Sequence, residues 1–179
     1  MIAGLLGIAA TSTPLRSRPG SPLHGIALLI ATWFGIGLIP LAPGTWGALA
    51  ALPIGWMIRG RWGAPGLAAA FAAVFVGGCW AAGAVANASG VQDPGAVVVD
   101  EVAGLWLVLL AAPPEPSAWA LAFLLFRLFD IWKPWPVRWA DLRVRGGFGI
   151  MLDDILAAGY AFAVLAAVLA IAGAVRVRI

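Results

Sequence analysis

Long apolar segments joined by short polar stretches make up most of the chain. The clearest segment, residues 64–86, contains no charged side chain, and another uncharged segment covers residues 155–175. About 20 apolar residues in a helix are enough to cross the hydrocarbon core of a bilayer. We therefore predict that both segments are transmembrane helices, which satisfy their own backbone hydrogen bonds as lipid requires.

Shorter apolar segments are also predicted to be helical, and no alternating strand pattern or internal repeat is visible. The segment 25–41 is near the minimum length for a crossing and ends at a break formed by Pro40, Pro43 and Gly44. The next segment starts at Thr45, a favourable N-cap residue, and is short for a crossing. The fold is therefore predicted to be all-α, with several transmembrane or half-spanning helices at residues 25–41, 45–58, 64–86, 97–112, 117–129 and 155–175.

Polar stretches define the predicted loops and the domain boundary. Residues 87–95 and 132–149 are predicted loops, and a proline-rich break at 113–116 separates two segments. Near the N-terminus, Arg16 and Arg18 follow a short apolar stretch, whereas a secretory signal carries its basic residues first. We predict a flexible N-terminal tail at residues 1–24 and a single helical membrane domain at residues 25–179.

Composition excludes most other classes of protein. Hydrophobic residues make up 63% and charged residues 11% of the chain, with a mean hydropathy of +0.98, whereas soluble domains contain roughly 45–50% apolar and about 25% charged residues. One cysteine, Cys79, and one histidine, His24, exclude a disulfide scaffold and a Cys/His zinc site. The net charge of +3 comes without a lysine-rich run. We therefore expect an anionic membrane lipid as partner and no nucleic acid.

Basic residues fall in four groups, at 16–18, 59–61, 133–145 and 176–178. The positive-inside rule would place all four groups on the cytoplasmic side. Three apolar segments lie between Arg61 and Lys133, so strict alternation of single crossings cannot achieve this. Some segments are therefore expected to be half-spanning, interfacial or buried.

Carboxylates are few and lie at the borders of apolar segments. A buried carboxylate needs a compensating cation, either a metal ion or a basic partner such as Arg127 or Lys133. Carboxylates without His or Cys suit a hard cation, and Mg²⁺ fits best because it also binds waters and phosphate oxygens. We favour a metal site, with a structural ion-pair network as the alternative, and expect the helices to surround a carboxylate-lined site. Six of the eight acidic residues lie at these borders: Asp93, Asp100, Glu101, Asp130, Asp153 and Asp154.

Two glycine-rich stretches accompany the acids. Residues 43–47 place the Thr45 hydroxyl and free N–H groups at a helix start, and residues 146–149 are predicted to form a similar turn before Asp153 and Asp154. Such turns can hold phosphate, and the dipole at a helix start favours an anion. The alternatives are that the glycines only make turns and that one of the two aspartates only caps a helix. Arg127 and Asp130, three residues apart, could likewise form an ordinary intrahelical pair.

If the substrate is a phosphate ester, several catalytic routes are closed. Cys79 has no arginine six residues later, and His24 stands alone in the N-terminal flank. Neither Asp-x-Asp nor Asp-Gly-x-x-Asp-Gly occurs. Metal-assisted attack by water, or by a hydroxyl such as that of Thr45, remains, with Arg127 or Lys133 stabilising the developing charge.

Four motifs occur in order between about residues 36 and 160. The first is Leu41-Ala42-Pro43-Gly44-Thr45-Trp46-Gly47, and the second is Asp93-Pro94 with Val98-Val99-Asp100-Glu101 and Gly104. The third is Phe126-Arg127-Leu128-Phe129-Asp130-Ile131-Trp132-Lys133-Pro134-Trp135-Pro136, and the fourth runs from Gly146 to Asp154, with Ala158-Gly159. Together they resemble the phosphatidylglycerophosphatase A family, and the 1–24 tail lies outside the resemblance.

The resemblance implies a multi-pass, Mg²⁺-dependent enzyme of the bacterial inner membrane that converts phosphatidylglycerophosphate to phosphatidylglycerol and phosphate. Its active site is expected on the cytoplasmic side, where the basic stretch 133–145 and the nearby tryptophans suit the headgroup plane. Asp100, Asp130 and Asp153 are the expected catalytic carboxylates. The resemblance implies Thr45, Arg127 and Lys133 as phosphate contacts and, as metal ligands, Asp100, Glu101, Asp130, Asp153 and Asp154.

Three other functions stay open on the sequence. In a transporter or channel, the acids would coordinate a permeating cation. In a non-catalytic membrane subunit, the charged groups would only hold helices together. A phosphatase acting on another lipid phosphate, such as phosphatidate, is the third. The motifs do not bear on the oligomeric state.

Overall fold

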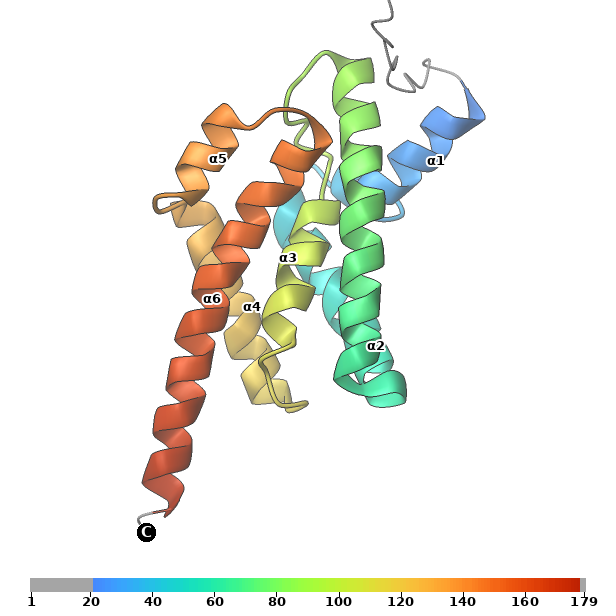
Figure 1. Cartoon of the computed structure of the whole chain (residues 1–179). Helices are drawn as coiled ribbons and strands as arrows, with labels where there is room; N and C mark the ends of the chain where they lie inside the picture. Colours follow the sequence, from blue (N-terminus) through green and yellow to red (C-terminus); the bar gives the residue numbers. More distant parts are fainter. Residues whose placement is uncertain (1–20, 178–179) are drawn as a thin grey trace, which may run out of the picture.

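Helices make up the fold of the computed structural model, which describes residues 21–177 (Figure 1). No strand occurs in this range, so the all-α prediction is confirmed. Residues 1–20 of the predicted tail lie outside the described range, whereas residues 22–24 belong to the first helix. The elements are α1 (Pro22–Ala31), η1 (Ile36–Leu38), α2 (Pro43–Ser89), α3 (Val99–Leu109), α4 (Pro116–Trp132), α5 (Val137–Arg143) and α6 (Gly146–Val177).

The longest helix, α2, joins two segments that the sequence predicted as separate helices. Its backbone departs from helical geometry at Gly63, with φ 65° and ψ −163°, and there the chain turns back, so that the two halves run in opposite directions (Figure 1). A positive φ costs glycine little because it has no Cβ. The helix starts at Pro43, and the Thr45 N–H donates to the Ala42 carbonyl. The N-cap is Ala42, so the prediction that Thr45 caps this helix was wrong by three residues.

Two helices are long and apolar enough to cross a membrane: α2 and, over Gly146–Ala174, α6. They contain the two strongest predicted transmembrane segments. The segment 25–41 is not one helix, because α1 ends at Ala31 and the next residues turn the chain. Trp33, Phe34 and Gly35 have φ values of 47°, 60° and 91°. The expectation of a near-minimal crossing there was wrong, and at 10 residues α1 is too short to span a bilayer.

The short helix α3 forms the centre of the bundle. It packs against α2, α4 and α6, and most of its 11 residues are buried (Figure 1). The buried Trp106 indole N–H donates to the Ala51 carbonyl of α2 at 3.0 Å. Protein therefore surrounds α3 on several sides, and the acidic residues in its first turn lie inside the bundle.

Helix α6 starts earlier than predicted. The glycine-rich stretch 146–149 forms its first turn rather than a turn before it, and the suggested contact with phosphate stays a prediction. A Cβ on Gly147 would overlap the carbonyl oxygen of Cys79, because α6 crosses α2 backbone to backbone at this point. Asp153 and Asp154 consequently lie about two turns inside α6 rather than at its start, and neither caps it.

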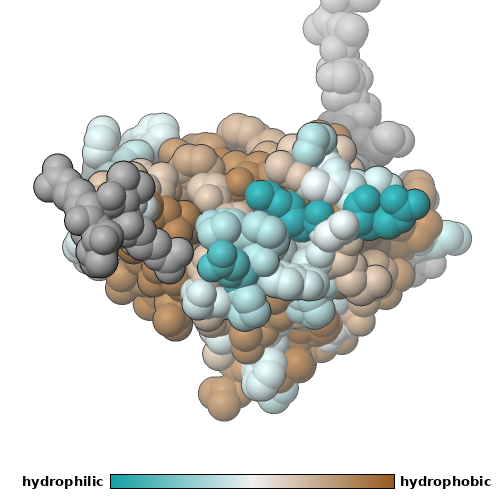
Figure 2. Space-filling model, turned by 90° about the horizontal axis from the view of Figure 1, so that it is seen from below, coloured by the Kyte–Doolittle hydropathy of each residue, from teal (hydrophilic) through white to brown (hydrophobic). Residues whose placement is uncertain are grey.

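The basic groups at 59–61 and 133–145 lie at opposite ends of the bundle. Arg59 donates to the carbonyls of Leu109 and Ala112, at 3.3 and 3.4 Å, near the start of α4. Lys133 follows the other end of that helix, about 25 Å away along its axis. Figure 2 shows the Arg59 end, where hydrophilic residues gather in a central area with hydrophobic residues around it. The groups at 59–61 and 133–145 therefore do not share one side. The predicted loop 132–149 contains α5 and the first turn of α6.

The close crossing of α6 and α2 gives a stability prediction. We expect Gly147→Ala to lower the stability of the protein in detergent by about 1–3 kcal/mol, because the added methyl group forces two backbones apart. Gly159→Ala, on the same helix with open space around its Cβ position, is the control. It should be neutral or stabilising by up to about 1 kcal/mol, since alanine favours helix. Thermal unfolding followed by circular dichroism measures both variants, and equal midpoints would contradict the packing argument.

Candidate metal centre

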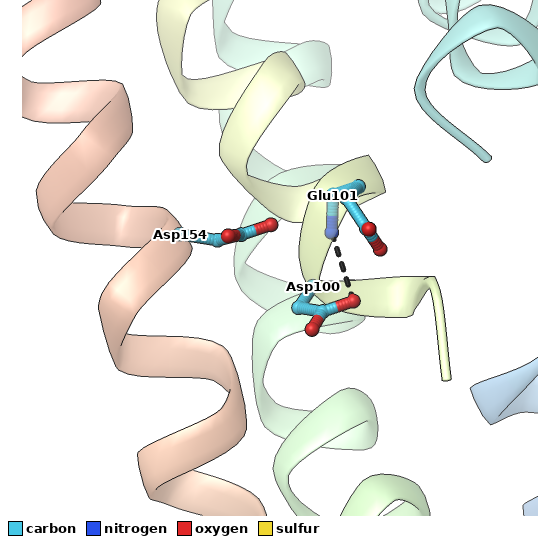
Figure 3. Close-up of side chains that lie close together, drawn as sticks. All are labelled: Asp100, Glu101 and Asp154. Atoms are coloured by element: carbon cyan, nitrogen blue, oxygen red, sulfur yellow. Dashed lines mark hydrogen bonds between the residues drawn. The ribbon is translucent and has the colours of Figure 1, made fainter. Parts of the chain in front are cut away.

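Three carboxylates from two helices meet inside the bundle (Figure 3). Asp100 and Glu101 occupy the first turn of α3, and Asp154 points towards them from α6. One carboxylate oxygen from each residue lies within 4.8 Å of the others. Asp100 and Asp154 are 8% and 3% exposed, and Glu101 is half-buried. We call this group the carboxylate trio.

Two oxygens of the trio have no partner in the described part of the chain. Glu101 Oε2 and Asp154 Oδ2 are buried without a hydrogen bond, whereas Asp100 Oδ1 accepts the Glu101 backbone N–H at 3.0 Å. A buried carboxylate oxygen without a donor is costly, and adjacent carboxylates repel one another. Both costs disappear when a hard divalent cation is bound, because its preferred ligands are carboxylate oxygens. The trio therefore has the composition and geometry to hold a metal ion.

Arg127 connects Asp130 to the trio. Its Nη1 lies 2.5 Å from Asp130 Oδ2 on the same helix and 3.8 Å from Glu101 Oε1 on α3. The predicted intrahelical pair is present, and the same guanidinium also reaches across to a second helix. Asp130 is therefore next to the trio through Arg127, and its side chain is 9% exposed.

The start of α2 forms another wall of the site. A Cβ on Gly44 would overlap Glu101 Oε1 and would lie 3.3 Å from Arg127 Nη1. Glycine is needed at this position because any side chain would displace the carboxylate. Thr45 follows Gly44 in the sequence and is half-buried.

Lys133 and Asp153 form a second charged group beside the trio. Lys133 Nζ lies 2.6 Å from Asp153 Oδ2 and 2.9 Å from Asp141 Oδ1. Burial lowers the pKa of the Lys133 ammonium, but its hydrogen bonds to these two carboxylates outweigh burial, and the net direction is upward. Lys133 is therefore a positive charge at the end of α4, and Asp153 is paired with it.

Two acidic residues near the site were not assigned from the sequence. Asp141 belongs to α5, a helix that the sequence did not predict, and it is the only acid in the basic stretch 133–145. Burial raises the pKa of Asp93, the charge of Lys133 opposes this, and Asp141 and Asp130 add to it. Asp93 thus lies in the same electrostatic neighbourhood. Its place in the motif Asp93-Pro94 was the signal that could have identified it.

The structure brings the five predicted acids into one region but divides their surroundings. Asp100, Glu101 and Asp154 face one another, Asp130 faces Arg127, and Asp153 faces Lys133. Of the predicted phosphate contacts, Arg127 lies next to Glu101 of the trio. Thr45 follows Gly44, which lies against Glu101. Lys133 pairs with Asp153, the neighbour of Asp154 in the sequence.

Comparison with known proteins gives consistent matches. The family model described as Phosphatidylglycerophosphatase A matches residues 29–169. The Phosphatidylglycerophosphatase A of Escherichia coli (strain K12) is 41% identical over 147 residues, which cover 79% of this chain and 80% of that protein. The protein of the same name from Haemophilus influenzae is 43% identical, over 83% of this chain and 89% of its own length.

A third relative carries a different name. A Bacteroides thetaiotaomicron protein, named provisionally as a phosphatidylinositol-3-phosphatase, is 40% identical over 79% of this chain and 92% of its own length. No solved structure matches.

The Lys133–Asp153 pair gives a prediction that does not depend on activity. We expect Lys133→Met and Asp153→Asn to destabilise the protein individually and to be less than additive together, with a coupling energy of about 1–2 kcal/mol. The reason is that Lys133→Met leaves Asp153 buried without its cation, whereas Asp153→Asn leaves Lys133 with Asp141 alone. The measurement is a double-mutant cycle: the free energies of unfolding of the wild type, the two single variants and the double variant in mixed micelles.

The matched control is Arg138→Met, since Arg138 is exposed on α5 and makes no ion pair within residues 21–177. It should show no coupling to Asp153→Asn. Additive effects of Lys133→Met and Asp153→Asn would mean that their contact contributes no stability.

Proposed function

The chain belongs to the phosphatidylglycerophosphatase A family, and from this premise we propose that it hydrolyses phosphatidylglycerophosphate to phosphatidylglycerol and inorganic phosphate. Family membership carries the proposal, and the buried carboxylate trio supports it, because it supplies a metal-binding group without histidine or cysteine. In this reaction water adds its oxygen to phosphorus, the bond from phosphorus to the glycerol oxygen breaks, and a proton passes to the glycerol hydroxyl.

We propose Mg²⁺ as the ion, held by Asp100, Glu101 and Asp154. One oxygen from each residue lies within 4.8 Å of the others, so the three side chains could hold a single ion. When bound, the ion would polarise a phosphoryl oxygen and make a coordinated water more acidic. The partnerless oxygens of Glu101 and Asp154 support this assignment.

Two cations of the chain are suited to bind the phosphate. Arg127 and Lys133 flank the trio, and each is held by an aspartate, Asp130 or Asp153, at 2.5 and 2.6 Å. A cation fixed in this way can stabilise charge that develops on the phosphoryl oxygens without first reorganising. We propose that Asp130 and Asp153 act by orienting these cations, and that a carboxylate of the trio, Asp100 being the candidate, accepts the proton of the attacking water.

Thr45 is proposed as a further phosphate contact. It lies in the first turn of α2, where the helix dipole favours an anion. Its neighbour Gly44 adjoins both Glu101 and Arg127, which places this turn beside the metal ligands. The hydroxyl therefore has the position to donate to a phosphate oxygen.

We propose that the site faces the cytoplasmic side of a bacterial inner membrane. The basic stretch 133–145 lies at the same end of the bundle as the carboxylates, and such stretches favour the cytoplasmic side. Trp132, Trp135 and Trp139 are exposed there, as expected of residues at a headgroup plane.

Metal dependence tests the proposed mechanism. We expect purified protein in detergent to release phosphate from phosphatidylglycerophosphate with Mg²⁺ and to stop when excess chelator is added. Asp154→Asn should lower kcat/KM by about 100-fold or more, because it removes a ligand oxygen. Glu115→Gln, which changes an exposed acid at the far end of the bundle, should behave as wild type.

The possible failures of this experiment have different meanings. Phosphate release that is insensitive to chelator would contradict the metal mechanism. No release from folded protein would contradict the phosphatase function and favour a transporter or a non-catalytic subunit. Loss of folding in Asp154→Asn would instead assign that residue to stability.

The name of the Bacteroides relative makes a second substrate worth measuring. We expect kcat/KM for phosphatidylglycerophosphate to exceed those for phosphatidylinositol-3-phosphate and phosphatidate by about tenfold or more, a difference of about 1.4 kcal/mol in transition-state stabilisation. Matched acyl chains and equal detergent ratios isolate the headgroup. A higher value for either of the other lipids would reassign the substrate within the same reaction class.

A further inference from the structure

An apolar groove opens on the surface between α2 and α4, away from the charged site. It has a volume of about 340 Å³, within the range of small-molecule sites. Trp56 and Trp119 form one part of its wall, with ring centroids 5.0 Å apart in an edge-to-face arrangement. All its lining residues are apolar: Leu52, Pro53, Trp56, Pro116, Trp119 and Ala120.

The groove and the charged site lie along the same two helices. At one end, Gly44 of α2 lies against Glu101 and against Arg127 of α4. At the other end, a Cβ added to Gly55 of α2 would lie 3.0 Å from Trp106 Nε1 of α3 and 3.5 Å from the ring of Trp119 of α4. The two helices therefore form a seam that leads from the carboxylate trio to the groove.

The distance from the carboxylate trio to the groove matches the depth of the acyl region in one leaflet. Along α2, residues 52–56 follow Gly44 by 8–12 positions, or about 12–18 Å of helix. Along α4, residues 116–120 precede Arg127 by 7–11 positions, or about 10–17 Å. The acyl region of one leaflet is about 15 Å deep, half of a hydrocarbon core of roughly 30 Å. A lipid whose phosphate lies at the trio would therefore place the ends of its acyl chains at this depth.

We propose that this groove binds the distal part of one acyl chain of the substrate lipid and makes hydrolysis sensitive to chain length. The inference rests on the proposed function, because it takes the phosphate of that substrate to be held at the trio. The groove's apolar lining excludes a headgroup or a metal ion as occupant. Its position on the seam links it to the charged site rather than to bulk lipid.

A substitution that fills the groove tests the proposal. Ala120→Phe adds a ring at an exposed lining position of α4. We expect it to lower the ratio of kcat/KM for dipalmitoyl to that for dioctanoyl phosphatidylglycerophosphate by about tenfold, since a chain of eight carbons ends above the groove. The control is Ala166→Phe, the same change at an exposed position of α6, and it should leave the ratio unchanged.

A photoreactive lipid tests the same contact without a variant. Phosphatidylglycerophosphate with a diazirine at the end of one acyl chain should label wild-type peptides that contain residues 52–56 or 116–120. The same lipid with the diazirine next to the glycerol should label neither peptide. Labelling spread evenly over α2, α4 and α6 would overturn the proposal in favour of bulk lipid.

The remaining outcomes separate this inference from the proposed function. Hydrolysis with the same chain-length ratio in wild type and Ala120→Phe would overturn the groove assignment and leave the phosphatase function standing. An oligomer that dissociates in Ala120→Phe, with the ratio unchanged, would assign the groove to a second copy of the chain. No hydrolysis of either lipid by folded wild type would remove the proposed function itself.

Discussion

Uncompensated negative charge in an apolar interior is the constraint on which this structure depends. Five carboxylates converge near the start of α3, and only two basic side chains, Arg127 and Lys133, pair with them in the described range. Lys133 is moreover shared with Asp141. The two ion pairs neutralise Asp130 and Asp153. The remaining negative charge lies on the three carboxylates of the trio. The ion-pair network that the sequence left open is thus present, and beside it lies a group of carboxylates that could hold a metal ion.

Short side chains require close backbones, and glycines provide them. An aspartate reaches only a few ångströms from its helix, so helices that share a metal ion through aspartates must approach closely. A Cβ on Gly104 would overlap the Phe126 ring and lie 3.2 Å from the Asp154 carbonyl oxygen, which shows how tightly α3, α4 and α6 meet one turn below Asp100. Gly44 and Gly147 play the same part for α2. These glycines therefore allow close packing around the carboxylates, a role that the sequence did not indicate, and Thr45 beside Gly44 remains the proposed phosphate contact.

The sequence predicted the helical class, the two longest apolar segments and the residues that gather at the site, because lipid-compatible helices and rare charges leave strong local signals. It failed where tertiary contacts override those signals. The pair Arg59 and Arg61 indicated a helix end, and a break does follow at Gly63, but the sequence did not indicate that Arg59 bonds carbonyls at the end of α3. Asp153 and Asp154 indicated a helix start because charge is unusual inside an apolar helix. Adjacent helical residues point about 100° apart. Asp154 therefore faces α3 and Asp153 faces Lys133, an assignment that only the packed structure shows.

The length of α3 explains how a lipid headgroup can meet a site made of buried acids. A helix that crossed the whole bilayer would carry residues at its first turn into the aqueous phase, where carboxylates are fully hydrated and hold Mg²⁺ weakly. With 11 residues, or about 16 Å, α3 covers roughly half the hydrocarbon core. Its acidic first turn is therefore enclosed by α2, α4 and α6 and lies level with the end of α4 that carries Arg127 and Asp130. The shortness of α3 thus keeps its carboxylates enclosed by the neighbouring helices and level with Arg127, an arrangement that a metal ion shared with a phosphate would require.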